Sequence, residues 1–280
     1  MSAERVRRRG GVPALAALVA LLALAAAPPA GSAAANARAG ARPAGPRARQ
    51  SLIYAGPPVE FMVVGAGNVI LDRAEVSTLP NETVSTSHGS CGVALGLPMD
   101  ALVVLSHQRR VSFTLHDYGH CTSAPASSGQ LFVTSIDGER NHGQNGWEYK
   151  VDGRSGTAGA ADPSGPFGNG PLKPYERVVW FWCQSFGGGC QRSLEVRGPG
   201  SVSPGATFTV SVIGQDNNGN GEPMSGARVS ASATHAPAAS AVTGRSGRVS
   251  FRAPSRATTL TLSASRPGSV PSFPFTVQVR

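Results

Sequence analysis

The chain has 280 residues, of which 15% are charged and 6% aromatic, with 35 Gly and 22 Pro. This composition excludes a protein built mainly from long charged helices and favours a β-rich chain of two small domains. The net charge is +9, but residues 1–50 hold eight Arg and one Glu, which leaves 17 basic and 15 acidic residues in 51–280. That remainder is nearly neutral as a whole, so no nucleic-acid partner is predicted.

The first 35 residues have the order of a secretory signal peptide. Arginines between Arg5 and Arg9 precede an apolar run from Val12 to Ala27, and small residues follow. A membrane anchor is disfavoured because about sixteen mostly alanine residues fall short of the roughly twenty that a bilayer requires. We predict a signal peptide at 1–35 and a disordered Arg/Pro/Ala linker at 36–57. The mature protein is then secreted or associated with the cell surface, with no transmembrane anchor after cleavage.

Four cysteines in an exported chain predict two disulfides, for which three pairings are formally possible. Cys183 closes a strand-like run and Cys190 follows a flexible Gly-rich turn, so these two can meet locally. Cys91 and Cys121 then form the second pair by elimination.

The predicted elements begin with two β-type runs at 59–64 and 69–76, joined by a hairpin turn at 65–68. A helix is predicted from Pro98 to an end near His107 and Arg109, because proline suits the first helical position and Asp100 the first turn. Further strands of this domain are predicted at 111–115, 131–136, 147–151 and 178–183.

Residues 153–170 form a long connection that contains six Gly and two Pro. Such a segment is typical of a functional or mobile loop. The strand that follows is apolar on both alternating faces, so one face meets the core and the other must meet something else. The three tryptophans near this loop are either core residues of a disulfide-linked domain or the floor of a ligand cleft with the loop as its rim. The predicted ligand-binding residues are Trp147, Tyr149, Asp162, Phe167, Trp180 and Trp182.

After Cys190 the composition changes. Residues 194–280 contain no Cys, Trp or Lys, and they carry eight Arg against three acidic residues. Short runs rich in Val, Ser and Thr recur with turn residues between them, as expected for about seven strands of an immunoglobulin-like sandwich. The clearest of these runs lie at 208–212, 227–231, 249–251, 258–262 and 275–279.

Metal and catalytic motifs are absent from the sequence. His116, His120 and Cys121 are close in sequence, but on a strand the two histidines would lie about 13 Å apart, too far for one ion. Asp216 begins a segment like the first half of a calcium loop, yet Ala227 stands where an acidic ligand is required, so a turn is predicted. There is no nucleophile elbow, His-Glu-x-x-His helix or phosphate loop. We therefore predict no metal, no cofactor and no enzyme activity.

The run GWEYKVDG at 146–153, followed by Asp162 and VVWF at 178–181, resembles the transcobalamin-like C-terminal domain family. The loop DPSGPFGNG at 162–170 and the closing Trp182-Cys183 are similar to a subgroup found in secreted actinobacterial proteins. The resemblance covers about residues 58–190 and implies a mostly antiparallel α+β domain, related to the part of transcobalamin that covers bound cobalamin. Asp152 replaces the usual Asn of the motif, and the loop at 153–170 is longer than in typical members. The second half is similar to bacterial immunoglobulin-like modules that accompany surface proteins.

The expected fold is mainly β, with an N-terminal α+β antiparallel domain containing one helix at 58–192 and a C-terminal immunoglobulin-like β-sandwich at 193–280. The expected function is that of a secreted, non-enzymatic binding protein that recognises a small ligand or glycan through an aromatic cleft in the first domain. The alternative is a structural or adhesion protein of the cell surface that contacts cell-wall polymers and binds no small ligand. A hydrolase is the third possibility.

Overall fold

A computed structural model describes residues 55–119, 121, 130–185, 189–234 and 236–280. The predicted signal peptide, residues 36–54 of the predicted linker and His120 lie outside the described residues. In the following, the N-terminal lobe is residues 58–192 and the C-terminal lobe is residues 193–280. Both belong to one compact unit of the chain.

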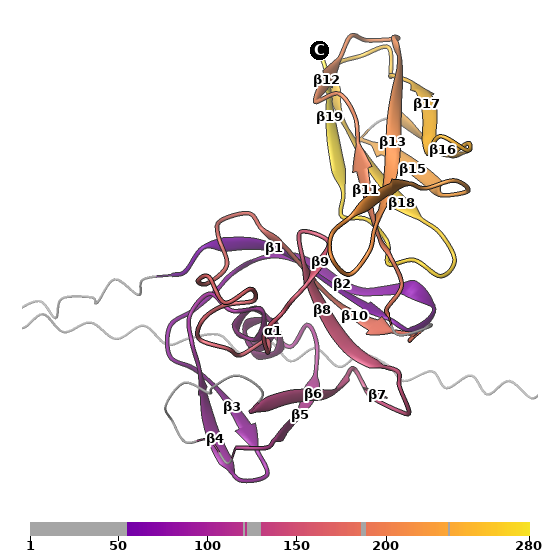
Figure 1. The fold of residues 1–280 in the computed structure, drawn as a ribbon. Coiled ribbons are helices and arrows are strands. Elements are labelled where there is room, and N and C mark those ends of the chain that lie inside the picture. Colours follow the sequence, from indigo (N-terminus) through magenta and orange to yellow (C-terminus); the bar gives the residue numbers. More distant parts are fainter. Residues whose placement is uncertain (1–54, 120, 122–129, 186–188, 235) are drawn as a thin grey trace, which may run out of the picture. The chain divides into compact units, whose positions relative to one another are not determined.

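The described residues of the N-terminal lobe form three sheets and one α-helix, α1 (Figure 1). The large sheet has the strand order β2-β1-β10-β8-β9, and two small sheets have the orders β3-β4 and β5-β6-β7. The elements in chain order are β1 (Pro58–Gly65), the short 3-10 turn η1 (Ala66–Asn68), β2 (Val69–Ser77), β3 (Glu82–Thr86), β4 (Gly89–Val93), α1 (Pro98–His107), β5 (Phe113–Asp117), β6 (Leu131–Ile136), β7 (Glu139–Arg140), β8 (Gly146–Val151), β9 (Arg154–Ser155) and β10 (Arg177–Cys183).

The pairing of these strands is antiparallel as expected, with one departure. β1 and β10 pair in parallel, so the large sheet is mixed. Neighbouring parallel strands need a long crossover connection, and the segment from η1 to the start of β10, which includes α1, supplies it. The predicted hairpin is confirmed: Gly67 and Asn68 adopt φ of 71° and 62° between β1 and β2.

Helix α1 has the predicted bounds and packs in the interior. Every residue from Pro98 to Leu105 is buried, and α1 contacts β2 and β3. A helix that is apolar on most sides must be surrounded by protein, which is why α1 lies between sheets and not on the surface.

The two apolar faces of β10 meet different partners. On one face, Val178 and Trp180 belong to the core that also contains α1. On the other, Val179 and Phe181 pack in a second cluster with Val270 of the C-terminal lobe. The expectation that each face must meet something is therefore confirmed, and the second partner is the other lobe.

Both predicted disulfides are present. Cys91 at β4 bonds Cys121 just after β5, with their Cα atoms 5.3 Å apart. Cys183 and Cys190 close a local loop with a Cα separation of 5.2 Å. Disulfides persist in oxidising compartments, so this pair of bonds indicates an extracytoplasmic protein. The described part of the chain has no helix with the length and apolar character needed to span a bilayer.

The C-terminal lobe is a two-sheet sandwich, as predicted. One sheet has the order β11-β13-β14, with β17 also paired to β13, and the other has the order β12-β19-β18-β15-β16. Alternating residues such as Val210, Val212 and Leu262 pack between the sheets. The strands are β11 (Ser193–Arg197), β12 (Ser201–Val202), β13 (Thr207–Gln215), β14 (Gly221–Pro223), β15 (Arg228–Ala233), β16 (Ala236–Val242), β17 (Arg248–Arg252), β18 (Thr258–Ser265) and β19 (Phe275–Val279).

Candidate functional site

Four of the residues predicted to bind ligand form a ladder of rings across β8 and β10. Trp182 lies opposite Trp147 in the strand register, and Trp180 lies opposite Tyr149. The Trp147 and Trp182 ring centroids are 5.7 Å apart with an edge-to-face geometry, and those of Tyr149 and Trp180 are 5.6 Å apart. All four side chains are between 3% and 7% exposed, so the ladder is an interior feature.

The polar atoms of the ring ladder are directed into the protein. Trp147 Nε1 donates to the Glu139 carbonyl oxygen at 2.8 Å, and Trp180 Nε1 donates to the Pro98 carbonyl oxygen at 3.2 Å. The Tyr149 hydroxyl donates to the Ala158 carbonyl oxygen at 2.6 Å, and burial of this hydroxyl raises the pKa of Tyr149. Such satisfied, buried rings fit the core interpretation. Ligand binding by the ladder stays a prediction.

The other two predicted residues lie in the loop at 153–170, which covers the ladder. The Ser164 backbone N–H donates to Asp162 Oδ1 at 2.8 Å, so Asp162 shapes a turn of the loop. Phe167 is half-buried against the core, and the Arg154 guanidinium lies 4.6 Å from its ring centroid. The loop is also tied to α1 through the Met99 N–H and the Ala160 carbonyl, 3.1 Å apart. The six predicted residues are thus brought together, as a packed layer.

Solvent-exposed rings lie instead on the β5-β6-β7 sheet. His116 is opposite Phe132 in the β5-β6 register, and Tyr118 follows on the same face of the sheet. The His116 and Tyr118 ring centroids are 4.2 Å apart, and those of Tyr118 and Phe132 are 6.4 Å apart. Tyr118 is 64% exposed and Phe132 is 44% exposed, which is unusual for rings of this size.

These rings border a surface hollow of about 290 Å³. A second hollow of about 290 Å³ adjoins it and shares Phe132 and Asn141 in its lining. We call the two hollows together the aromatic groove. Its lining residues are Thr114, His116, Tyr118, Phe132, Thr134, Arg140 and Asn141 in the first hollow and His142–Trp147, Glu148 and Cys183 in the second.

The aromatic groove has fixed and available polar groups. Asn141 is fixed, because its Nδ2 donates to the Val133 carbonyl oxygen at 2.8 Å and its Oδ1 accepts from the Trp147 N–H at 3.0 Å. Arg140 is exposed and makes no ion pair with the described residues. The His142 ring lies 5.4 Å from the buried Trp182 ring, so the ring ladder supports the floor of the second hollow.

Sequence reasoning missed this groove. In the sequence His116 was considered as a metal ligand and rejected, and Tyr118 and Phe132 are single aromatics in separate segments. One sequence feature could have indicated the groove. His116 and Phe132 occupy outward positions of β5 and β6, where polar side chains are expected because these positions alternate with more buried residues.

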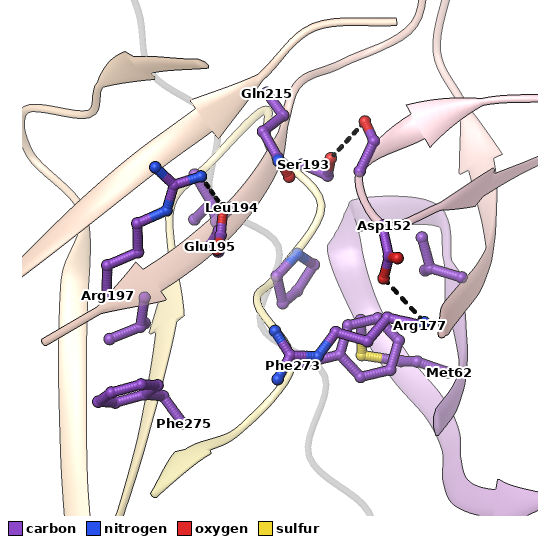
Figure 2. A pocket seen from close by; sticks show the side chains of 14 residues that line it. Met62, Asp152, Arg177, Ser193, Leu194, Glu195, Arg197, Gln215, Phe273 and Phe275 are labelled. Carbon is purple, nitrogen blue, oxygen red and sulfur yellow. Dashed lines mark hydrogen bonds and ion pairs between the residues drawn. The ribbon is translucent and has the colours of Figure 1, made fainter. Parts of the chain in front are cut away.

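A further hollow of about 290 Å³ is lined by residues of both lobes (Figure 2). Its charged groups are paired within the protein. Arg197 contacts Glu195 at 2.7 Å, and Arg177 contacts Glu60 at 2.8 Å. The Asp152 carboxylate accepts the Arg177 backbone N–H at 3.0 Å, as Figure 2 shows. Because these charges are already satisfied, we assign the hollow to the packing of the lobes.

One side-chain group in the described residues has the composition of a metal site. Cys91, Asp117 and Cys121 place their ligand atoms within 4.8 Å of one another. The two sulfurs are joined in a disulfide, and metal coordination by cysteine requires free thiolates. This group therefore supports no metal hypothesis.

Comparison with known proteins gives a partial family match. Residues 101–164 match the model of a domain of unknown function, DUF4430, which is a transcobalamin-like domain family. The matched segment runs from α1 into the loop that covers the ring ladder, and it includes the exposed rings of β5 and β6. The match does not extend to the C-terminal lobe. No curated protein matches the chain.

Proposed function

We propose that this protein is a secreted or surface-associated binding protein, without catalytic activity, that recognises glycans through the aromatic groove. The observation that supports this most directly is the row of exposed rings, His116, Tyr118 and Phe132, beside two adjoining hollows. The two disulfides support an extracytoplasmic location, where glycans are abundant ligands.

The chemistry of the groove suits a sugar. A pyranose ring has an apolar C–H face that packs on an aromatic ring, and hydroxyl groups at its edge that need hydrogen-bond partners. Tyr118 and Phe132 offer ring surface, while Arg140 and the Thr134 hydroxyl lie in the same lining. Because Phe132 and Asn141 border both hollows, neighbouring units of one oligosaccharide can occupy them.

The residues predicted from the sequence have a supporting role in this proposal. Trp182 packs beneath His142, and Trp147 contributes to the lining of the second hollow. The ring ladder thereby holds β8 and β10 rigid behind the groove, and a rigid support lowers the entropy lost on binding. If the N-terminal lobe is a transcobalamin-like domain, the proposal means that it binds a glycan in this groove by itself and that no cobalamin takes part.

The test uses the mature chain, residues 36–280, with a glycan array followed by titration calorimetry on the best oligosaccharide. Tyr118→Ala and Phe132→Ala should each weaken binding by about tenfold, which corresponds to about 1.4 kcal/mol, because each removes a stacking surface. Their melting temperatures should stay close to that of the wild type, since both rings are exposed.

Tyr175→Ala is the matched control, because Tyr175 is 67% exposed and lies outside the groove. Equal losses in all three variants would contradict the proposal, as would glycan binding that neither groove variant changes. If no glycan binds, the structural or adhesion function becomes the better account of the molecule.

A further inference from the structure

The end of the chain has an unusual charge composition. Residues 223–280 contain seven Arg, no Lys and no acidic residue, whereas residues 51–222 hold ten basic and fifteen acidic residues. Residues 51–280 are nearly neutral in total only because the positive charge of 223–280 offsets the negative charge of 51–222.

Four of the seven arginines follow one strand. Arg248 and Arg252 lie at the two ends of β17, and Arg245 and Arg256 lie in the turns on either side; all four are exposed. Phe251 points into the sandwich core, so Arg248, Ser250 and Arg252 point outward. Residues four apart on a strand are separated by about 13 Å. We call Arg245, Arg248, Arg252 and Arg256 the arginine strip.

The strand beside the strip carries several hydroxyl groups. In the register of β13 and β17, Thr207 lies opposite Arg252 and Ser211 lies opposite Arg248. Between them, the Thr209 and Ser250 hydroxyl oxygens are 2.8 Å apart. The residues between and opposite the two arginines are Ser and Thr, which supply no apolar side chain for insertion into a lipid bilayer.

The acidic residues of the C-terminal lobe are engaged elsewhere. Glu195 contacts Arg197 at 2.7 Å, and Glu222 contacts Arg192 at 3.2 Å. Asp216 accepts the Asn218 N–H at 2.8 Å within the β13-β14 turn. Among the described residues, no ion pair includes a member of the arginine strip. The strip therefore has two outward charges on β17 and two exposed charges in the adjoining turns, and none of the four forms an ion pair among the described residues.

We propose that the arginine strip binds a linear polymer of repeating phosphate groups. Guanidinium groups form bidentate hydrogen bonds with phosphate oxygens, and the strip is made of arginine alone. Charges spaced by about 13 Å along β17 match a ligand that repeats its charge along a chain, and a single phosphate could contact only one of them. The Thr209 and Ser250 hydroxyl groups, which lie between Arg248 and Arg252, supply hydrogen bonds to the phosphate oxygens of the same polymer.

This site is independent of the aromatic groove, which lies in the other lobe. The test measures binding of the mature chain to fluorescent long-chain inorganic polyphosphate across a salt series. The double variant Arg248→Gln/Arg252→Gln should weaken binding about tenfold at low salt. It should also reduce the slope of log affinity against log salt by roughly one to two, because fewer counterions are released.

The matched control is Arg228→Gln/Arg266→Gln, which removes the same charge from two exposed arginines of the same lobe. It should weaken binding by less than about threefold, since only long-range attraction is lost. Circular dichroism melting of both double variants checks that each is folded. Tyr118→Ala should leave polyphosphate binding unchanged, which separates this result from the glycan test.

Three outcomes would overturn the proposal. One is equal weakening in both double variants, which would mean that overall charge alone is sensed. Another is tighter binding of heparin or of phosphatidylglycerol vesicles than of polyphosphate, which would assign the strip to sulfated glycans or to lipid headgroups. The third is the absence of polyphosphate binding at low salt.

Discussion

Asp100 is a carboxyl group with no solvent exposure at the start of α1. Its Oδ2 accepts the Gly96 backbone N–H at 2.8 Å, and its Oδ1 accepts the Leu79 N–H at 3.4 Å. The side chain therefore fastens the end of β2 and the loop before the helix to the first turn of α1. The cost of this position is desolvation, and burial raises the pKa of Asp100 from 3.8 to about 7.

This shift predicts a pH dependence of stability. Because the folded pKa lies above the unfolded value, the folded state prefers the protonated form. The contribution of Asp100 to the free energy of unfolding should thus be greatest below about pH 4. It should fall by roughly 4 kcal/mol as the pH rises from there to about 7. Asp100→Asn keeps only one of the two acceptor oxygens, at a cost that does not depend on pH, and it removes the titrating charge. The stability of the variant relative to the wild type should therefore improve as the pH rises toward 7.

Urea unfolding of both proteins between pH 4.5 and about 8 measures this effect, because their difference isolates Asp100 from every other titrating group. The difference should grow with pH in favour of Asp100→Asn. A difference that stays constant across the series would contradict the assignment of the pH dependence to Asp100.

At the scale of elements, the loop at 153–170 is long but anchored. Thr157 and Ala158 donate their N–H groups to the Pro166 carbonyl oxygen at 2.9 and 3.3 Å, and the Tyr149 hydroxyl donates to Ala158. Position 156 must be glycine, because a Cβ atom at this position would overlap the Tyr149 hydroxyl group. A segment so rich in glycine is expected to be mobile, but the buried Tyr149 hydroxyl and these backbone hydrogen bonds hold it in place.

Tyr149→Phe tests how much this anchor contributes. The variant removes one hydroxyl and leaves the Ala158 carbonyl oxygen without its donor, so the free energy of unfolding should fall by about 1 to 2 kcal/mol. Amide hydrogen exchange should accelerate mainly within the loop, because the ring itself still packs against Trp180. Unchanged exchange in the loop, with the same loss of stability, would place the effect in the core instead.

The elements that could be predicted from the sequence are those with strong local patterns. The strand at 131–136 and the helix at 98–107 have the predicted bounds, because each combines a periodic apolar pattern with clear ends. The β3-β4 hairpin was missed, since its polar, Gly-containing strands depend on tertiary packing and the Cys91 disulfide. The strand predicted at 111–115 begins two residues later, at Phe113, and Val111 is buried before it without belonging to the strand.

The candidate site depends on information that a single sequence does not contain. That four rings of β8 and β10 share a face follows from the strand pattern, but whether this face is interior depends on the loop that covers it. The exposed row of His116, Tyr118 and Phe132 exists only because β5 and β6 pair with His116 opposite Phe132. This register is set by how the two strands pair, and no local motif encodes it.

At the scale of the whole molecule, the C-terminal lobe packs against one face of the large sheet of the N-terminal lobe. Val179 and Phe181 of the sheet pack against Val270, which is fully buried. Two backbone hydrogen bonds of 2.9 Å, from Leu194 to Val270 and from Val270 to Arg192, fix this contact. Lys150 on the same face is also buried, and desolvation lowers its pKa to about 8, which indicates how little water reaches this surface.

An apolar contact of this kind should couple the unfolding of the two lobes. Val270→Asp buries a carboxylate against the apolar side chains of Val179 and Phe181, so it should separate the lobes at a cost of several kcal/mol. In differential scanning calorimetry the wild type should unfold in a single transition. Val270→Asp should show two transitions, the first at a clearly lower temperature, because each lobe has its own core and loses only the shared surface.

Val242→Asp provides the comparison, because Val242 lies in the same lobe and is 52% exposed. This variant should keep the single transition of the wild type within a few degrees. If the wild type itself unfolds in two transitions that Val270→Asp does not move, then each lobe is stable alone and the covered face of the sheet contributes nothing to cooperativity. A single transition that divides only in Val270→Asp would instead show that the C-terminal lobe stabilises the sheet behind the aromatic groove, so that both proposed binding surfaces depend on one cooperative unit.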